Sequence, residues 1–210
     1  MTIAWPRNML IPTTGGSPVY VPRTVSGPTS VSGFRQSVAS DAGGWQVTLG
    51  GILIRTRADL LKWNELAVLL EGRLNPVLVP VFSRKPGPDP FFSDETGHDT
   101  DAPVEATVSG AAALRATTMA VNVAYGGALV PGMDFSIGER LYRVRSIVSV
   151  VGSVTTVTIR PGLRVALSGG ETAEFNAPVV KCRLADDLMP IDLQSFKRAS
   201  PSVTFIEDPT

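Results

Sequence analysis

The sequence predicts a mainly β protein with one flanking α-helix and a small β-barrel inserted into the chain. Its 20 glycines and 17 prolines are scattered through 210 residues, which is typical of many short strands joined by turns. Only residues 57–71 place apolar side chains at helical spacing. At 83–105 the chain becomes polar, proline-rich and acidic, which indicates a domain boundary. The length suits one β-rich domain that carries a smaller one.

The N-terminal part alternates between proline-rich and strand-like segments. Residues 8–30 hold four prolines. Because proline cannot donate to a β-ladder, this segment is predicted to be an extended arm at a sheet edge or against a partner. Residues 45–49 alternate apolar and polar side chains and predict a strand. A bulge or turn at Gly50-Gly51 and a second strand at 52–54 are expected to follow.

The helix is predicted from its ends as well as its spacing. Thr56 and Asp59 form a variant of the capping box, in which the Thr56 hydroxyl accepts from the Asp59 amide. Gly72 stands where a left-handed residue would end the helix. The apolar face predicts that the helix packs on a sheet, with Trp63 and Leu66 buried. A strand at 75–82 follows it.

A run of short strands predicts the barrel, of about 70 residues. The expected strands are at 107–108, 114–116, 120–124, within 131–138, at 141–148 and at 154–159. Alternation returns at 179–184 and 202–207, so these strands are expected to complete the first sheet. Residues 1–87 and 176–210 are therefore assigned to the main domain. Residues 88–175 are assigned to the inserted barrel, with 88–105 as an acidic linker.

Composition argues against most chemical functions. Basic and acidic residues number 19 each, so no global field draws the chain to nucleic acid or to an acidic membrane. The start has no sustained apolar region, and no apolar stretch is long enough to span a bilayer. A single cysteine, Cys182, excludes a disulfide within the chain and fits a reducing cytoplasm. With His98 as the one histidine, an enzyme is not expected.

Four features suggest sharper chemistry, and each has a plainer interpretation. Carboxylates at Asp89, Asp94, Glu95, Asp99 and Asp101 could hold calcium, but their spacing does not match an EF-hand and predicts a solvated loop. Cys182 lies mid-strand, which favours a buried, inert thiol over a nucleophile paired with His98. Glycine pairs such as Gly43-Gly44 lack the lysine of a phosphate loop. Arg143 and Arg145 share a strand face, which predicts a solvated face rather than a phosphate site.

The order of several short motifs resembles distal tail proteins and related minor tail proteins of long-tailed (siphovirus-like) bacteriophages. The motifs are Trp45 on an early strand, the helix motif of Arg57, Leu61 and Trp63-Asn64, the turn from Gly72 to Pro76, the segments 131–144 and 159–164, and the ending 205–208. This resemblance implies a tail-tube-like β-sandwich with a flanking helix. It also implies a hexameric ring in the virion tail tip, between the tail tube and the tip or fibre proteins. Larger carbohydrate-binding appendages, which many such proteins carry, are missing.

Three functions follow as expectations. The first is a ring-forming structural subunit of the tail tip, made in the bacterial cytoplasm, with no catalytic residues, cofactor or metal. The second is a binding module whose barrel recognises a host-surface glycan or another tail-tip protein. The third is a wall hydrolase, which needs paired carboxylates in a cleft. The expected partners are further copies of the chain, the tail tube protein and hub or fibre proteins. The candidate subunit-interface residues are Leu10, Ile11, Val19, Tyr20, Val21, Phe205 and Ile206.

Overall fold

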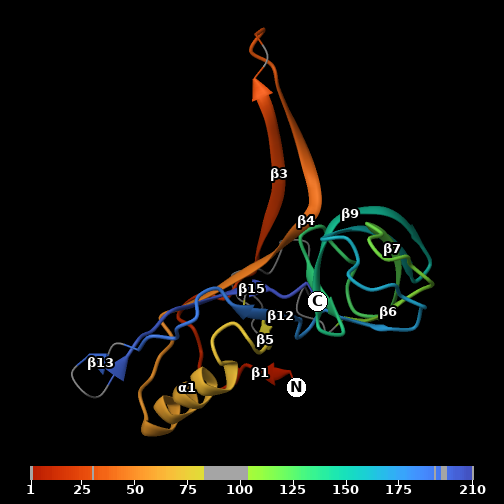
Figure 1. The fold of residues 1–210 in the computed structure, drawn as a ribbon. Coiled ribbons are helices and arrows are strands. Elements are labelled where there is room, and N and C mark those ends of the chain that lie inside the picture. The colour runs from red at the N-terminus through yellow and green to blue at the C-terminus, as the bar shows by residue number, and fades with distance from the viewer. Residues whose placement is uncertain (1, 30, 83–103, 192, 195–197, 210) are drawn as a thin grey trace, which may run out of the picture.

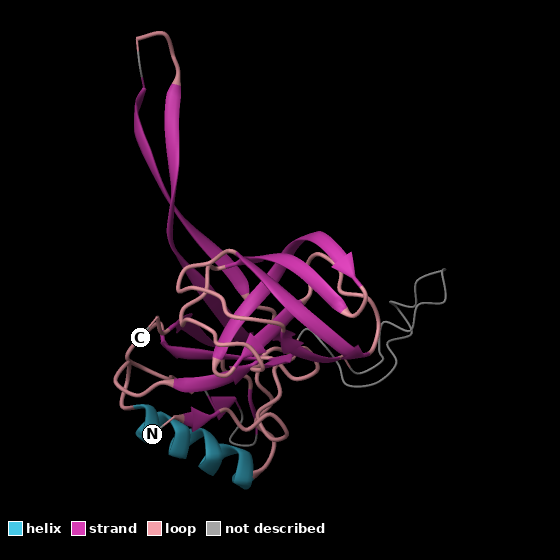
Figure 2. Cartoon of the chain, turned by 90° about the vertical axis from the view of Figure 1, so that its right-hand side faces the viewer, coloured by secondary structure: helices cyan, strands magenta, loops and turns pink. Residues whose placement is uncertain are grey.

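The chain forms a sheet with a helix on one face, a closed barrel beside it and a long hairpin that projects away from both (Figures 1 and 2). The computed structural model describes residues 2–29, 31–82, 104–191, 193–194 and 198–209. This architecture confirms the prediction of a mainly β protein with a flanking helix and a small barrel. The acidic residues from 89 to 101 and His98 lie outside the described residues.

The main domain is built on one seven-stranded sheet in the described chain. Its path is β1-β5-β12-β15-β4-β2, and β3 also pairs with β4. Only β1 and β5 run parallel, and every other pair is antiparallel. The bounds are β1 Ile3–Ala4, β2 Thr14–Gly15, β3 Val19–Thr29, β4 Arg35–Gly50, β5 Val77–Pro80, β12 Val179–Leu184 and β15 Val203–Glu207. A small second sheet joins β13 (Leu193–Gln194) to β14 (Arg198–Ala199).

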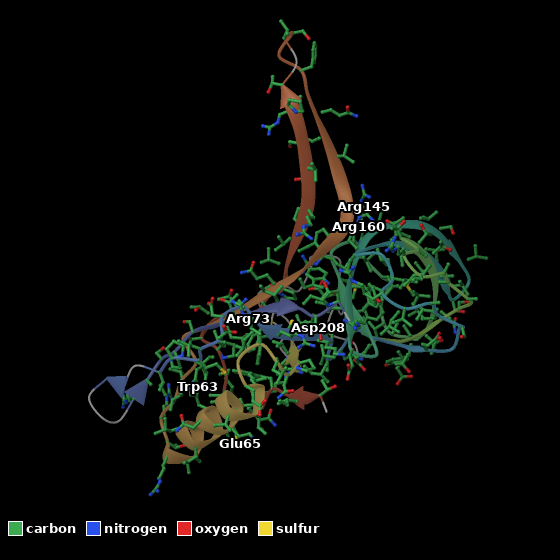
Figure 3. All side chains as sticks on the ribbon, in the orientation of Figure 1. Trp63, Glu65, Arg73, Arg145, Arg160 and Asp208 are labelled. Atoms are coloured by element: carbon green, nitrogen blue, oxygen red, sulfur yellow. The ribbon has the colours of Figure 1, made fainter. Side chains whose placement is uncertain are left out.

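Helix α1 (Arg57–Leu70) supplies the layer that covers the sheet. It buries Trp63, Leu66 and Leu70, which join the same apolar core as Trp5 and Phe205. Figure 3 shows the two faces of α1: Trp63 lies on the side toward the sheet, and Glu65 lies on the opposite side. The helix ends as Glu71 adopts a left-handed conformation (φ 47°), with Gly72 also at positive φ. The predicted left-handed ending is thus one residue earlier than expected.

The predicted capping box at the start of α1 is present. The Asp59 amide donates to the Thr56 hydroxyl at 3.1 Å, and the Asp59 carboxylate accepts from the amides of Thr56 (2.9 Å) and Arg55 (3.1 Å). The Thr56 backbone N–H donates to the Asp59 carboxylate, and this hydrogen bond is the main reason why the pKa of Asp59 lies below its ordinary value. A carboxylate with a lowered folded-state pKa stabilises the fold above its unfolded-state pKa. That contribution is lost as the pH falls through the folded-state value.

Removal of the cap therefore has a defined consequence. Thr56→Ala is expected to lower the free energy of unfolding by about 1 kcal/mol at neutral pH. Thr56→Ser keeps the hydroxyl and serves as the control. Asp59→Asn is expected to destabilise the protein at neutral pH, with the difference from wild type shrinking in acid. Urea denaturation at several pH values measures both effects, and an unchanged midpoint for Thr56→Ala contradicts the role of the cap.

The barrel is closed in the order β10-β7-β6-β11-β8-β9. Its interior is filled by apolar side chains, among which Phe135 and Phe175 stack with ring centroids 4.8 Å apart. The bounds are β6 Glu105–Val108, β7 Thr118–Tyr125, β8 Asp134–Ile137, β9 Arg140–Val151, β10 Val154–Arg160 and β11 Thr172–Glu174. These strands are consecutive in the chain, and the sheet strands of the main domain lie on either side of them.

Independent folding of the main domain stays a prediction, and the two ends of the insertion make it testable. Pro80 and Val179 are partners in the sheet, so the chain leaves and re-enters at neighbouring positions. Replacement of residues 83–176 by a short Gly/Ser linker is expected to leave a cooperative thermal transition, because closing such a loop costs little. The midpoint should fall, since Leu141 of the barrel belongs to the core of the main domain. Loss of the cooperative transition in circular dichroism would count against an inserted domain.

Four local predictions are corrected by the structure. Residues 52–54 form no strand, and only Ile54 makes an isolated bridge, to Ala199. The predicted strand 114–116 is a turn, because Arg115 has a φ of 66° and the segment closes one end of the barrel through Leu163. The predicted strand 75–82 is confined to β5. Residues 8–30 are not a single arm, since Leu10 is in the core and β2 and β3 pair with β4.

Candidate assembly surface

Strands β3 and β4 form a two-stranded hairpin that leaves the sheet and projects into solvent (Figures 1 and 2). At about 3.3 Å per residue, the 11 residues of β3 extend roughly 35 Å. Nine of these 11 residues are exposed, and only Tyr20 and Gly27 are partly covered. An isolated two-stranded hairpin is at best marginally stable in water. A hairpin of this length is therefore a candidate surface for contact with another molecule.

Successive cross-strand pairs of the hairpin differ in polarity. Val25 and Val38 are directly opposite each other, and their side chains are 67% and 59% exposed. The next pair along the ladder, Ser26 and Ser37, joins its hydroxyls at 2.9 Å. Pairs two residues apart share a face of the ladder, so Arg23 and Ser40 flank the valine pair on its own face, and the exposed apolar area here is this one cross-strand pair. Val31 and Phe34 add exposed apolar side chains at the tip.

The two outer edges of the hairpin also differ. Among the described residues, β3 pairs only with β4, and β4 has no second strand neighbour from Arg35 to Trp45, since its pairing with β15 begins at Gln46. Unpaired edges present free backbone donors and acceptors to any approaching strand. Pro22 and Pro28 remove donors from β3, whereas the outer part of β4 contains no proline. The edge of β4 is therefore the better template for strand addition.

The root of the hairpin is tightly packed. Tyr20 and Trp45 are partners across the ladder, and their rings meet edge to face at 5.6 Å. A Cβ atom at Gly43 would lie 2.3 Å from the Tyr20 hydroxyl, so a larger residue there would displace the Tyr20 ring. The Trp45 indole donates to the carbonyl of Leu141 in the barrel at 2.8 Å. Beside this root is a groove of about 420 Å³, lined by Val21, Pro22, Arg23, Gly43, Gly44, Trp45, Gln46, Arg164, Ile206, Glu207 and Pro209.

Two ion pairs lie at the contact between the barrel and the hairpin root. Arg143 on β9 binds both carboxylate oxygens of Asp134, at 2.6 and 2.8 Å, and its guanidinium lies 4.9 Å from the Trp45 ring centroid. The hydrogen bond to Asp134 is the main reason why the pKa of Arg143 is raised. Arg164 binds both oxygens of Glu207, at 3.1 and 3.2 Å, and this carboxylate is 3% exposed. The prediction of a solvated face thus fails for Arg143, whereas Arg145 is exposed.

The predicted interface residues fall into three groups: buried, half-buried and exposed. Leu10 and Phe205 are fully buried in the core of their own chain, so their apolar character reflects folding rather than a contact with a neighbour. Phe205 is on β15, which lies between β12 and β4 in the sheet and is not a terminal arm. Tyr20 is half-buried against Trp45. The exposed candidates are Ile11, Val19, Val21 and Ile206.

The outer part of β4 and the tip belong to this candidate surface, and the sequence interpretation did not single them out. Ser32-Gly33, with Gly33 at a φ of 80°, is a turn signal between two strands rich in Val, Ser and Thr. That signal was present in the sequence. Cys182, in contrast, is buried as predicted, and burial raises the pKa of its thiol.

Comparison with known proteins adds no assignment: no family model and no curated protein sequence matches the chain. Within the described ranges, no cluster of three or more His, Cys, Asp or Glu residues is placed to hold a metal ion. The described part of the chain also contains no helix with the length and hydrophobicity needed to cross a bilayer.

Proposed function

We propose that this chain is a structural subunit of the tail tip of a long-tailed bacteriophage, and that it joins the tail tube to tip or fibre proteins by self-assembly into a ring. The β3–β4 hairpin carries the proposal, because it is long, projects from the sheet and exposes most of β3. The hexameric state, the virion location and the neighbouring tube and hub proteins come from the resemblance of the motifs around Trp45, α1 and residues 131–144.

The hairpin suits ring formation for a geometric reason. A contact between two different patches of neighbouring copies is head-to-tail, and such contacts generate closed rings when the rotation between copies closes. In the proposed ring, the hairpin of one copy contacts a different patch on the next copy, whereas pairing of two hairpins with each other would give a closed two-fold dimer. The apolar pair Val25–Val38 supplies burial, and the open edge of β4 supplies backbone hydrogen bonds.

The alternative of a glycan-binding barrel has less support. Sugar-binding surfaces use exposed aromatic rings, and residues 106–175 contain only Tyr125, Phe135, Tyr142 and Phe175. Phe135, Tyr142 and Phe175 are buried in the barrel core, which leaves only Tyr125 exposed in this range. No observation therefore favours this second function.

A paired substitution on the hairpin tests the proposal. Val25→Thr with Val38→Thr keeps the shape and β propensity of both side chains but makes this cross-strand pair polar. Burial of each valine contributes about 1.5–3 kcal/mol, so assembly should require at least about tenfold higher protein concentration. The matched control is Val148→Thr with Val150→Thr on the exposed surface of β9. Light scattering over a concentration series measures the mass. An intact chain that stays monomeric at every concentration contradicts self-assembly.

A further inference from the structure

Two arginines of the inserted barrel donate hydrogen bonds to the base of the hairpin, one at the start of β3 and one in β4. Arg143 on β9 donates from Nη2 to the carbonyl of Pro18, which directly precedes β3, at 3.1 Å. Arg164, in the loop after β10, donates from Nη2 to the carbonyl of Gly43 in β4, at 2.6 Å. Both acceptor residues are buried. The barrel therefore holds the hairpin at the point where both strands leave the main domain.

Each arginine is itself held rigidly by a carboxylate. Asp134 binds Arg143 through two oxygens, and Glu207 does the same for Arg164. Bidentate, charge-assisted pairs of this kind fix the plane of the guanidinium as well as its position. Glu207 also accepts the backbone N–H of Trp45 at 3.0 Å, which ties the same carboxylate to β4. The Arg164 amide donates to the buried Tyr142 hydroxyl at 3.1 Å, which positions the loop.

The hairpin needs such a support because its ladder is irregular at the root. The register shifts between Val21 and Arg23, where Pro22 interrupts the donors of β3. Two glycines, Gly43 and Gly44, lie opposite this point on β4. A two-stranded ribbon with a bulge, a proline and two glycines at its base can swing about that base. The sheet alone does not fix the direction of the hairpin.

We propose that the inserted barrel aims the hairpin, with Arg143 and Arg164 as positioning residues that clamp the start of β3 and the root of β4. The consequence for ring assembly rests on the proposed function, whereas the clamp itself concerns only the isolated chain. A ring closes only if every copy presents its hairpin at the same angle. The clamp would therefore allow assembly by limiting the angles that the free subunit samples, which lowers the entropy lost on joining.

The direct test is a distance distribution between the hairpin tip and α1. Spin labels are attached at Val31→Cys and Val68→Cys, which replace exposed side chains, while the native Cys182 is buried and does not react. Pulsed electron spin resonance on the monomer then gives the distribution of label separations. The intact clamp is expected to give one narrow distribution.

The clamp variant removes each arginine together with its carboxylate, so that no buried charge is left unpaired. It combines Arg143→Gln with Asp134→Asn, and Arg164→Gln with Glu207→Gln. We expect the distribution to broaden in this variant and the concentration needed for assembly to rise. The matched control is Arg145→Gln, an exposed arginine on the same strand. It should change neither quantity.

The outcomes separate the clamp from a general loss of stability and from the proposed function. A lower thermal midpoint with an unchanged distribution would overturn the proposal, since it shows a structural role without aiming. Arg143→Lys keeps the charge but cannot hold Asp134 and Pro18 together, so it should fold normally and broaden the distribution partially. If the multiple variant does not fold, Arg143→Lys alone tests whether the clamp limits the direction of the hairpin. If the distribution broadens but assembly does not depend on the hairpin, the clamp stands and the proposed function fails.

Discussion

Trp63→Ala is expected to lower the free energy of unfolding by about 3–5 kcal/mol, the usual cost of removing a fully buried aromatic side chain. Trp63 is 1% exposed and meets Trp5 edge to face, with ring centroids 6.4 Å apart. Alanine would leave a large cavity between α1 and the sheet. Leu61→Ala, on the exposed side of the same helix, should change stability by no more than about 0.5 kcal/mol.

Trp63→Phe refines this prediction. The indole N–H of Trp63 is buried and has no acceptor among the described residues. Phenylalanine removes that unsatisfied donor and keeps most of the apolar contact, so it should cost far less than alanine. Urea denaturation followed by circular dichroism measures all three variants. A folded Trp63→Ala protein with an unchanged midpoint would show that the helix does not pack on the sheet in this way.

Shortening the hairpin is expected to abolish assembly while leaving the subunit folded. Val21 and Gly44 are partners in the ladder, so an Asn-Gly turn can replace residues 22–43 between them. The removed segment makes most of its contacts within itself, apart from the Gly43 carbonyl that accepts from Arg164. The thermal midpoint should therefore fall only slightly, and light scattering should report a monomer at every concentration.

Removal of residues 1–25 is a contrasting variant. This segment contains Trp5 and Leu10, which are 4% and 0% exposed in the core, and β1, which pairs with β5. We expect that truncation to unfold the main domain, so it cannot separate folding from assembly. If the shortened-hairpin protein still forms multimers of the same mass, the joining surface lies elsewhere on the subunit.

Local signals predicted much of this fold. Thr56 and Asp59 are three residues apart, so their capping box could be predicted from neighbouring letters alone. The alternation in β10 and β12 indicated strands because one face of each is buried. Residues 35–38 of β4 gave no such pattern, because their side chains are exposed on both faces of the strand. The pairing of β4 with β3 could be established only from the folded structure.

The site was harder to predict because its contacts are long-range. Apolar residues such as Leu10 and Phe205 look alike in sequence whether a core or a neighbour covers them, and here the core does. Arg143 appeared solvated, yet Asp134 is its partner across β8 and β9, which only the register reveals. Glu207 and Arg164 are separated by 43 residues, and no local pattern joins them.

Hydrogen exchange at the hairpin amides tests the central claim most directly. The intact protein is labelled at a low concentration, where light scattering reports monomer, and at a high concentration, where it reports the assembled form. We predict that peptides covering 22–44 exchange rapidly in the monomer and become protected on assembly, because a neighbouring subunit then covers the hairpin and pairs with its open edge. Equally rapid exchange of these peptides in both forms, with protection gained elsewhere, would contradict the account.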